Sequence, residues 1–211
     1  DPQEARDMAI YGLELSEKFN IPVMLRPTTR VSHARADVEV SQDRPIPVER
    51  RFVKNPARRV ALPSHARPLH HELLAKQPAI EEELEGCPWN RLTLRGETGV
   101  IASGIAGLYA EEALMDLDLD HTLLRIGAYP APKKLICRML EHVSRVLVIE
   151  ELEPVVEEQV AMLAGKINPS IEILGKEKEI PREGELDLIT VRNALARMNG
   201  LGNMERASFA A

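Results

Sequence analysis

Apolar and polar residues follow two different periods along the second half of the chain. From Gly96 onward, short apolar runs predict strands, and apolar residues at three- and four-residue steps predict helices between them. Strands that alternate with helices form a parallel sheet with right-handed crossovers and helices on both faces, so the sequence predicts an α/β fold. The expected strands are residues 100–102, 122–126, 145–149 and 171–174, and the expected helices are residues 105–114, 133–143, 155–163 and 187–199.

The first residues of the chain carry a helix signal. Asp1 is a capping residue, Pro2 suits the first helical position, and Glu4 places an acid in the first turn. The helix is expected to run to about Phe19, and residues 21–26 then predict a short buried strand. One helix and one strand cannot bury both of their apolar faces, so we expect them to pack on a parallel sheet outside this sequence. Together with the missing initiator Met, this predicts a piece of a longer protein, which we expect to self-associate as a homodimer.

The segment from Arg26 to Arg67 is a basic connector. It holds ten Lys and Arg against four Asp and Glu, a local net charge of +6, and prolines interrupt it. One interpretation is a basic strip that meets an anionic ligand. The favoured one is an extended, arginine-rich crossover held against acidic protein surface. A connecting helix is expected next, over residues 68–85.

Length and charge exclude several classes of protein. The chain has 211 residues, enough for one domain and part of a second. Its 27 Lys and Arg against 33 Asp and Glu give a net charge of −6, so no overall basic field exists to hold a nucleic acid. The apolar runs are far shorter than the roughly 20 residues of a membrane span. We therefore expect a cytoplasmic chain that binds neither nucleic acid nor membrane.

Candidate metal and nucleotide sites are weak. Cys87 and Cys137 are the only cysteines, which excludes a disulfide framework, a Cys zinc site and an iron–sulfur cluster built from this chain alone. His65, His70 and His71 crowd the connector, but Pro68 lies between the first two and no H-E-x-x-H spacing occurs, so we favour solvated side chains. No G-x-G-x-x-G or G-x-x-x-x-G-K-[ST] motif is present.

Two polar segments follow predicted strands. Glu150 and Glu151 end an apolar strand, where parallel sheets place working groups. In one interpretation, one of these residues acts as an acid or anchors an interface. In the favoured interpretation, one carboxylate accepts hydrogen bonds from backbone N–H groups of the next loop, or it caps the helix after Pro154. Residues 28–33 gather hydroxyls, a guanidinium and an imidazole. Two interpretations of this segment have equal support: a site that binds an anion, and a turn whose polar side chains hydrogen-bond to its own backbone groups.

Several motifs, in order along nearly the whole chain, resemble one family. They are Asp1-Pro2-Gln3-Glu4-Ala5, Leu25-Arg26 running into Thr29-Arg30-Val31-Ser32-His33, Gly127-Ala128-Tyr129-Pro130, Val146 to Pro154, and Pro181-Arg182-Glu183-Gly184-Glu185-Leu186. The sequence is similar in these motifs to the α subunits of indolepyruvate:ferredoxin oxidoreductases, which are thiamine diphosphate-dependent 2-oxoacid:ferredoxin oxidoreductases. The resemblance implies a central fragment of such a subunit.

The family plan implies four regions. Residues 1–40 correspond to the C-terminal piece of the pyrimidine-binding domain, 41–95 to a crossover with a connecting helix, 96–200 to a transketolase C-terminal-like domain, and 201–211 to a tail. The resemblance further implies ferredoxin-dependent oxidative decarboxylation of aryl pyruvates to acyl-CoA. The alternative is a self-standing α/β binding or regulatory module without catalysis.

The cofactors of the family are thiamine diphosphate, Mg²⁺ and 4Fe–4S clusters, and its partners are the rest of the α subunit, a β subunit, ferredoxin and CoA. This chain lacks a Gly-Asp-Gly…Asn segment and a cysteine run. We therefore expect it to hold no cofactor, metal or catalytic residue and to be inactive alone. By the resemblance, Arg30 offers a guanidinium fork to a 2-oxoacid carboxylate, Ser32 and His33 position that group or a linking water, and Glu150 holds a loop.

Overall fold

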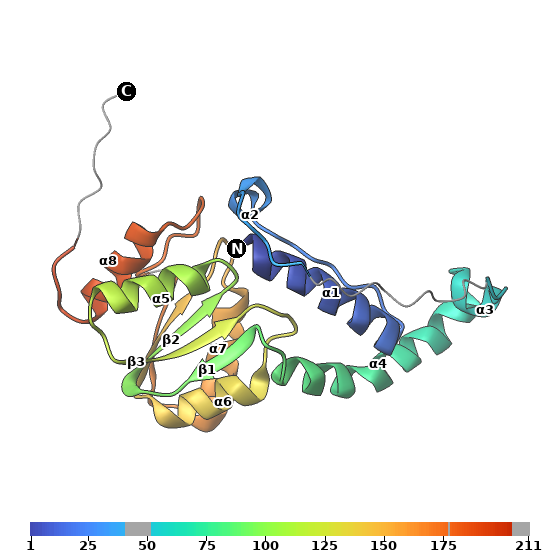
Figure 1. Ribbon diagram of the computed structural model, residues 1–211. Helices are drawn as coiled ribbons and strands as arrows, with labels where there is room; N and C mark the ends of the chain where they lie inside the picture. Colours follow the sequence, from blue (N-terminus) through green and yellow to red (C-terminus); the bar gives the residue numbers. More distant parts are fainter. Residues whose placement is uncertain (41–51, 177, 204–211) are drawn as a thin grey trace. The chain divides into compact units, whose positions relative to one another are not determined.

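The computed structural model describes residues 1–40, 52–176 and 178–203 (Figure 1). The chain divides into two compact units, Asp1–Ile80 and Glu81–Ala211. The boundary falls inside one long helix, α4 (Pro63–Glu85).

The second unit is built on a five-stranded sheet. Its strands are β1 (Asn90–Thr93), β2 (Gly96–Ser103), β3 (His121–Ile126), β4 (Arg145–Ile149) and β5 (Glu172–Leu174), in the order β1-β3-β2-β4-β5. β2, β3, β4 and β5 run parallel, whereas β1 pairs antiparallel with β3 at one edge. The predicted parallel α/β sheet is confirmed, and its four strands lie where the apolar runs placed them. β1 was not predicted.

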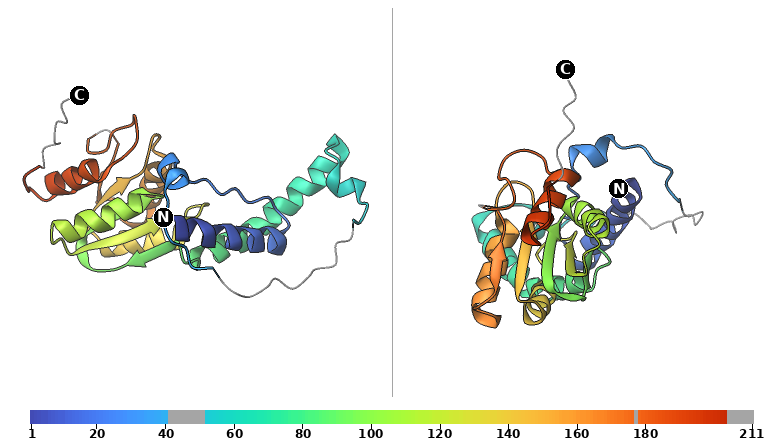
Figure 2. Two further views of the ribbon diagram at one scale, coloured as in Figure 1. Left: turned by 45° about the horizontal axis from the view of Figure 1, so that its top comes forward. Right: turned by 90° about the vertical axis from the view of Figure 1, so that its left-hand side faces the viewer.

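Helices cover both faces of this sheet, as expected. α5 (Ala106–Asp116) and α8 (Leu188–Met198) pack on one face, and α6 (Lys133–His142) and α7 (Val155–Ile167) on the other (Figures 1 and 2). Successive strand residues point to opposite faces. In β4, Leu147 and Ile149 therefore join the α5–α8 core, while Val146 and Val148 join the α6–α7 core.

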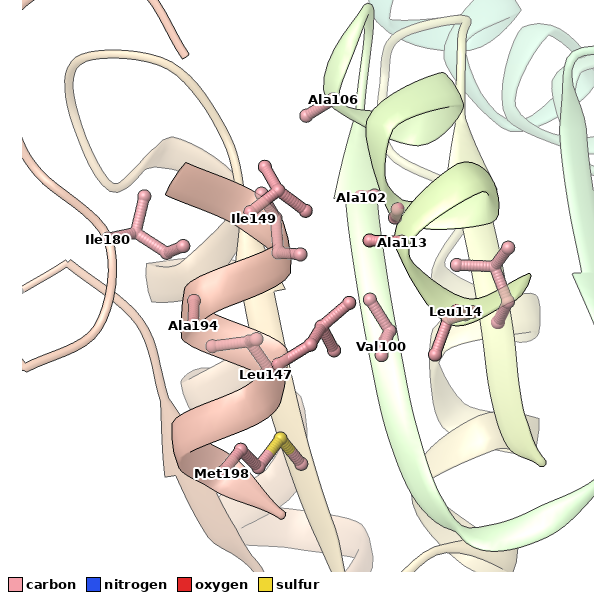
Figure 3. Packing of buried hydrophobic residues seen from close by; sticks show 14 of the residues in the cluster. Val100, Ala102, Ala106, Ala113, Leu114, Leu147, Ile149, Ile180, Ala194 and Met198 are labelled. Carbon is pink, nitrogen blue, oxygen red and sulfur yellow. The ribbon is translucent and has the colours of Figure 1, made fainter. Parts of the chain in front are cut away.

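The α5–α8 core combines small and large side chains. Ala106 and Ala113 of α5 are fully buried, so the helix lies close to the sheet (Figure 3). Leu147 and Ile149 from β4 fill the space beside Ala194 and Met198 of α8. Interdigitated packing of this kind makes the core sensitive to any change of side-chain volume.

The first unit starts with the predicted helix. α1 (Pro2–Phe19) begins with a capping box, in which the Asp1 carboxylate accepts from the Glu4 amide at 2.8 Å. It ends at Asn20, whose left-handed conformation (φ 50°) is common at helix C-termini. Both ends therefore agree with the sequence signals.

The strand predicted over residues 21–26 is not formed. The segment has no regular secondary structure and pairs with no other strand among the described residues, and Met24 is 86% exposed. A strand is stable only when a neighbour satisfies its N–H and C=O groups. The strand prediction was therefore wrong, because the apolar run finds no strand to pair with in the described part of the first unit.

Two short helices lie where the sequence predicts irregular structure, and a third helix is longer than predicted. The turn expected at residues 28–33 contains α2 (Thr29–His33), which the Thr28 side chain caps by accepting from the Val31 amide at 3.5 Å. α3 (Pro56–Arg59) lies within the basic connector, and α4 begins five residues before the expected helix and includes Pro68 and Pro78. The part of the connector over residues 41–51 lies outside the described residues.

The last turn of α4 is held by α6 of the second unit. The Glu85 carboxylate accepts from the amides of Lys134 (2.6 Å) and Leu135 (3.1 Å), and Glu81 pairs with Lys133 at 2.9 Å. α6 follows Pro132, which has no side-chain group to cap the helix, so Glu85 supplies the missing acceptor. This contact explains why the compact second unit begins at Glu81.

His121 makes the stability of the second unit depend on pH. It is buried at the start of β3, and its Nε2 has no hydrogen-bond partner among the described residues. Burial lowers the pKa of His121, against opposing contributions from the Asp120 backbone and the Asn199 side chain. On acidification the unfolded chain binds this proton first, near the ordinary His pKa of about 6.5. The free energy of unfolding is therefore expected to fall as the pH drops through that value.

The measurement is urea unfolding of the unaltered chain and of His121→Gln at several pH values on both sides of 6.5. The variant keeps an uncharged polar side chain and cannot take up a proton, so its free energy of unfolding is expected to vary less with pH. Equal pH dependence in the two proteins would assign the effect to other groups.

Candidate functional site

The loops that follow the parallel strands form the candidate site, which we call the carboxyl edge. It comprises residues 104–105 after β2, 127–132 after β3, 150–154 after β4 and 175–186 after β5, without the undescribed residue 177. After β2 the chain continues to β3 on one side of it, and after β4 it continues to β5 on the opposite side, so the direction of the connections changes between β2 and β4. Open α/β sheets bind ligands at such a change of direction.

Glu150 lies at this point and is 5% exposed. Its carboxylate accepts from the Val156 amide with both oxygens (2.9 and 3.0 Å) and from the Glu157 amide at 2.8 Å. Burial raises the pKa of Glu150, while these amides and the charge of Lys176 oppose that shift. α7 follows Pro154, which has no capping group, so Glu150 caps α7. The capping interpretation is confirmed.

Lys176 is buried beside Glu150 and was not predicted. Its ammonium donates to the backbone carbonyls of Glu150 and of Pro181, the latter at 3.2 Å. Burial lowers the pKa of Lys176, and the nearby carboxylates of Glu150 and Glu157 oppose that shift. The Glu157 carboxylate also accepts from the Lys176 amide at 2.9 Å. Lys176 therefore joins the end of β4 to the loop after β5.

The acids after Glu150 hold the same loop from its other end. Glu151 accepts from the Leu186 amide at 3.1 Å, and Glu153 pairs with Arg182. A Cβ at Gly175 would lie 2.1 Å from the Glu157 carboxylate, so a larger residue at this position would displace that side chain. The four carboxylates named at this edge, those of Glu150, Glu151, Glu153 and Glu157, are thus used to fix loops. Each of these carboxylates is bound by a backbone amide or a cation of the same unit.

Asn90 fixes the loop after β3. Its side-chain amide donates to the carbonyls of Leu84 (2.9 Å) and Ala128 (3.1 Å), and its oxygen accepts from the amides of Gly127 and Ala128, both at 3.1 Å. The next residue, Tyr129, precedes Pro130 in a cis peptide bond and is 59% exposed. The phenol oxygen of Tyr129 accepts from Gln159 of α7. A buried asparagine therefore positions an exposed tyrosine at the carboxyl edge.

The predicted substrate-binding residues lie elsewhere in the chain. Arg30, Ser32 and His33 belong to α2 in the first unit and are exposed. α2 brings them within one short helix, with the Ser32 amide donating to the Thr28 carbonyl at 3.0 Å. Their role in binding a 2-oxoacid stays a prediction.

Within residues 1–40, 52–176 and 178–203, no three His, Cys, Asp or Glu side chains gather in a way that would hold a metal ion. Among the helices of these residues, none has the length and apolar character needed to cross a bilayer.

Comparison with known proteins gives a consistent set of relatives, although no protein-family model matches the chain. Indolepyruvate oxidoreductase subunit IorA of Thermococcus kodakarensis is 40% identical over an alignment that covers 95% of this chain and 32% of that subunit. IorA of Methanothermobacter thermautotrophicus is 36% identical, covering 98% of this chain and 34% of the subunit. IorA of Pyrococcus abyssi is 38% identical, and the alignment covers 94% of this chain and 32% of that subunit.

A solved structure of 2-oxoglutarate:ferredoxin oxidoreductase from Magnetococcus marinus aligns with 65% of this chain and 24% of its own, with 15% identity and a TM-score of 0.44. The chain spans about a third of the length of the curated relatives that it matches. The resemblance found in the sequence motifs is therefore confirmed: over 95% of its length, this chain is similar to a segment of indolepyruvate oxidoreductase subunit IorA.

Proposed function

We propose that this chain is a central segment of the α subunit of an indolepyruvate:ferredoxin oxidoreductase. The complete enzyme would oxidatively decarboxylate aryl pyruvates to acyl-CoA and pass the electrons to ferredoxin. The observation that carries the proposal is the 35–40% identity to five IorA subunits over 94–98% of this chain. Similarity along the whole segment supports a shared role more strongly than a shared fold does.

Within that subunit, the segment acts as a framework and an interface. The hydrogen bonds of three side chains, those of Glu150, Glu151 and Lys176, go to backbone groups at the carboxyl edge. This supports a structural role for these residues. Tyr129 and Val155, on either side of Gln159, are 59% and 51% exposed. Exposed apolar side chains on a rigid edge favour contact with another protein surface, so we assign this edge to contact with the rest of the α subunit.

The residues of this chain do not fit a thiamine diphosphate site. Its sequence has no Gly-Asp-Gly…Asn segment for Mg²⁺ and diphosphate. Glu150, the buried carboxylate of the described residues, is bound by helix amides and is not free to meet a cofactor nitrogen. We therefore assign thiamine diphosphate, Mg²⁺ and the iron–sulfur clusters to other parts of the enzyme, and we expect this segment to be inactive alone.

The remaining assignments follow from the same proposal. The partners are the rest of the α subunit, a β subunit, ferredoxin and CoA, in a cytoplasmic enzyme whose α subunit forms a homodimer. Residues 1–40 complete a pyrimidine-binding domain, 41–95 form the crossover, 96–200 form the transketolase C-terminal-like domain and 201–211 form a tail. The exposed apolar residues Val23, Met24 and Leu25 support the first of these, because they need a sheet to cover them.

A segment exchange tests the proposal. This chain replaces the matching segment of Thermococcus kodakarensis IorA, which is expressed with its β subunit and assayed for indolepyruvate-dependent reduction of a viologen dye. The control is the same exchange with the Methanothermobacter thermautotrophicus segment, which is similarly related to this chain. We expect the two exchanged enzymes to have kcat/KM values within about tenfold of each other. An assembled, cofactor-loaded enzyme that lacks activity only with this chain would contradict the proposal.

A further inference from the structure

The first unit contains a cavity of about 360 Å³ that the proposed function does not use. Its wall combines residues just after α1, residues around α3 and the middle of α4. Pro22 and Leu69 are among the apolar residues of the wall, whereas Arg58, Arg59 and Lys76 supply three positive charges. A volume of this size accommodates a small organic molecule.

The positive charge of the cavity is only partly neutralised. Arg58 pairs with Glu72, which is the one carboxylate among the lining residues. The side chains of Arg59, which is exposed, and of Lys76, which is half-buried, make no hydrogen bond or ion pair within the part of the chain that the structure describes. The wall therefore has a net charge of +2, carried by two side chains without a protein partner. An anionic ligand would give these two cations a charge partner at the cavity wall.

We propose that this cavity binds a small organic phosphate, with the phosphate between Arg59 and Lys76 and the organic part against Pro22 and Leu69. A phosphate dianion matches two uncompensated cations, whereas a monocarboxylate would leave one of them unneutralised. The guanidinium of Arg59 supplies a planar fork for two phosphate oxygens, and Lys76 supplies a point charge. The apolar wall selects for a ring or chain attached to the phosphate.

This proposal applies the anionic-ligand interpretation of the basic connector to one place, while an ion pair beside it fits the favoured interpretation. Arg58 and Arg59 belong to the connector; Arg58 pairs with the Glu72 carboxylate of α4, whereas Arg59 lines the cavity without an ion pair among the described residues. The inference rests on the first unit alone. It holds or fails independently of the oxidoreductase activity proposed above.

Binding of adenosine 5′-monophosphate to the 211-residue chain tests the proposal by calorimetry, with adenosine and inorganic phosphate as partial ligands. We expect saturable binding of the nucleotide, and at least about tenfold weaker binding of each partial ligand. Lys76→Met and Arg59→Met are each expected to weaken nucleotide binding about tenfold, the effect of one lost charged hydrogen bond. Lys166→Met, an exposed change on α7, is the matched control and is expected to leave binding unchanged.

Three results would overturn the proposal. They are no saturable nucleotide binding at millimolar concentration, adenosine binding as tightly as the nucleotide, and unchanged affinity in both Lys76→Met and Arg59→Met. Inorganic phosphate binding as tightly as the nucleotide would overturn the role given to the apolar wall. Circular dichroism of each variant separates loss of the site from loss of folding.

Discussion

Glu150→Ala is expected to lower the free energy of unfolding by about 3 kcal/mol. The substitution leaves the amides of Val156 and Glu157 without their acceptor in a buried part of the chain. Each such amide costs about 1–3 kcal/mol when it is left unsatisfied. The substitution also removes the negative charge next to the buried Lys176. The two losses act in the same direction, so the effect exceeds that of an ordinary helix cap.

Urea denaturation followed by circular dichroism measures this loss. Glu158→Ala is the matched control, because Glu158 is exposed on the same helix and its carboxylate makes no hydrogen bond within the described residues. It is expected to change stability by less than about 0.5 kcal/mol. Glu150→Gln should lie between the two, since it keeps one acceptor oxygen and loses the charge. Equal stability of Glu150→Ala and Glu158→Ala would show that the cap contributes nothing.

Glu150 could be found in the sequence because its position is set locally. An acid directly after the apolar run of β4 and four residues before Pro154 is placed to meet the helix that follows. Lys176 has no such signal. It is buried because the loop that contains Pro181 and Leu186 returns over the carboxyl edge, and that return depends on contacts made only in the folded unit. Local patterns predict capping groups better than they predict groups buried by a distant loop.

The same distinction explains which strands were predicted. β4 was predicted with its observed bounds because it is a continuous apolar run buried on both faces. The segment 21–26 has a similar apolar pattern, but no strand among residues 1–40 and 52–80 pairs with it. β1 has the opposite property: Leu92 is its only apolar residue, and it exists because it pairs with β3. A strand's existence is decided by its partner, which a single sequence does not display.

Asn90, in β1, is the residue whose loss is expected to disturb the carboxyl edge most. Asn90→Ala removes two donated and two accepted hydrogen bonds and leaves the amides of Gly127 and Ala128 without their side-chain acceptor. We expect a loss of about 3 kcal/mol in the free energy of unfolding. Asn203→Ala, a change at an exposed asparagine in the described C-terminal stretch, is expected to cost less than about 0.5 kcal/mol.

A second measurement separates a local effect at the edge from general destabilisation. Trp89 is the single tryptophan of the chain, and its carbonyl accepts from the Gly127 amide at 3.0 Å. Once Asn90 no longer holds Gly127 and Ala128, the loop after β3 is expected to open more often than the rest of the unit. Acrylamide should therefore quench the Trp89 fluorescence of Asn90→Ala more strongly at urea concentrations where circular dichroism still reports a folded sheet. Quenching that rises only together with the loss of circular dichroism would mean that Asn90 stabilises the unit as a whole and does not act on this loop.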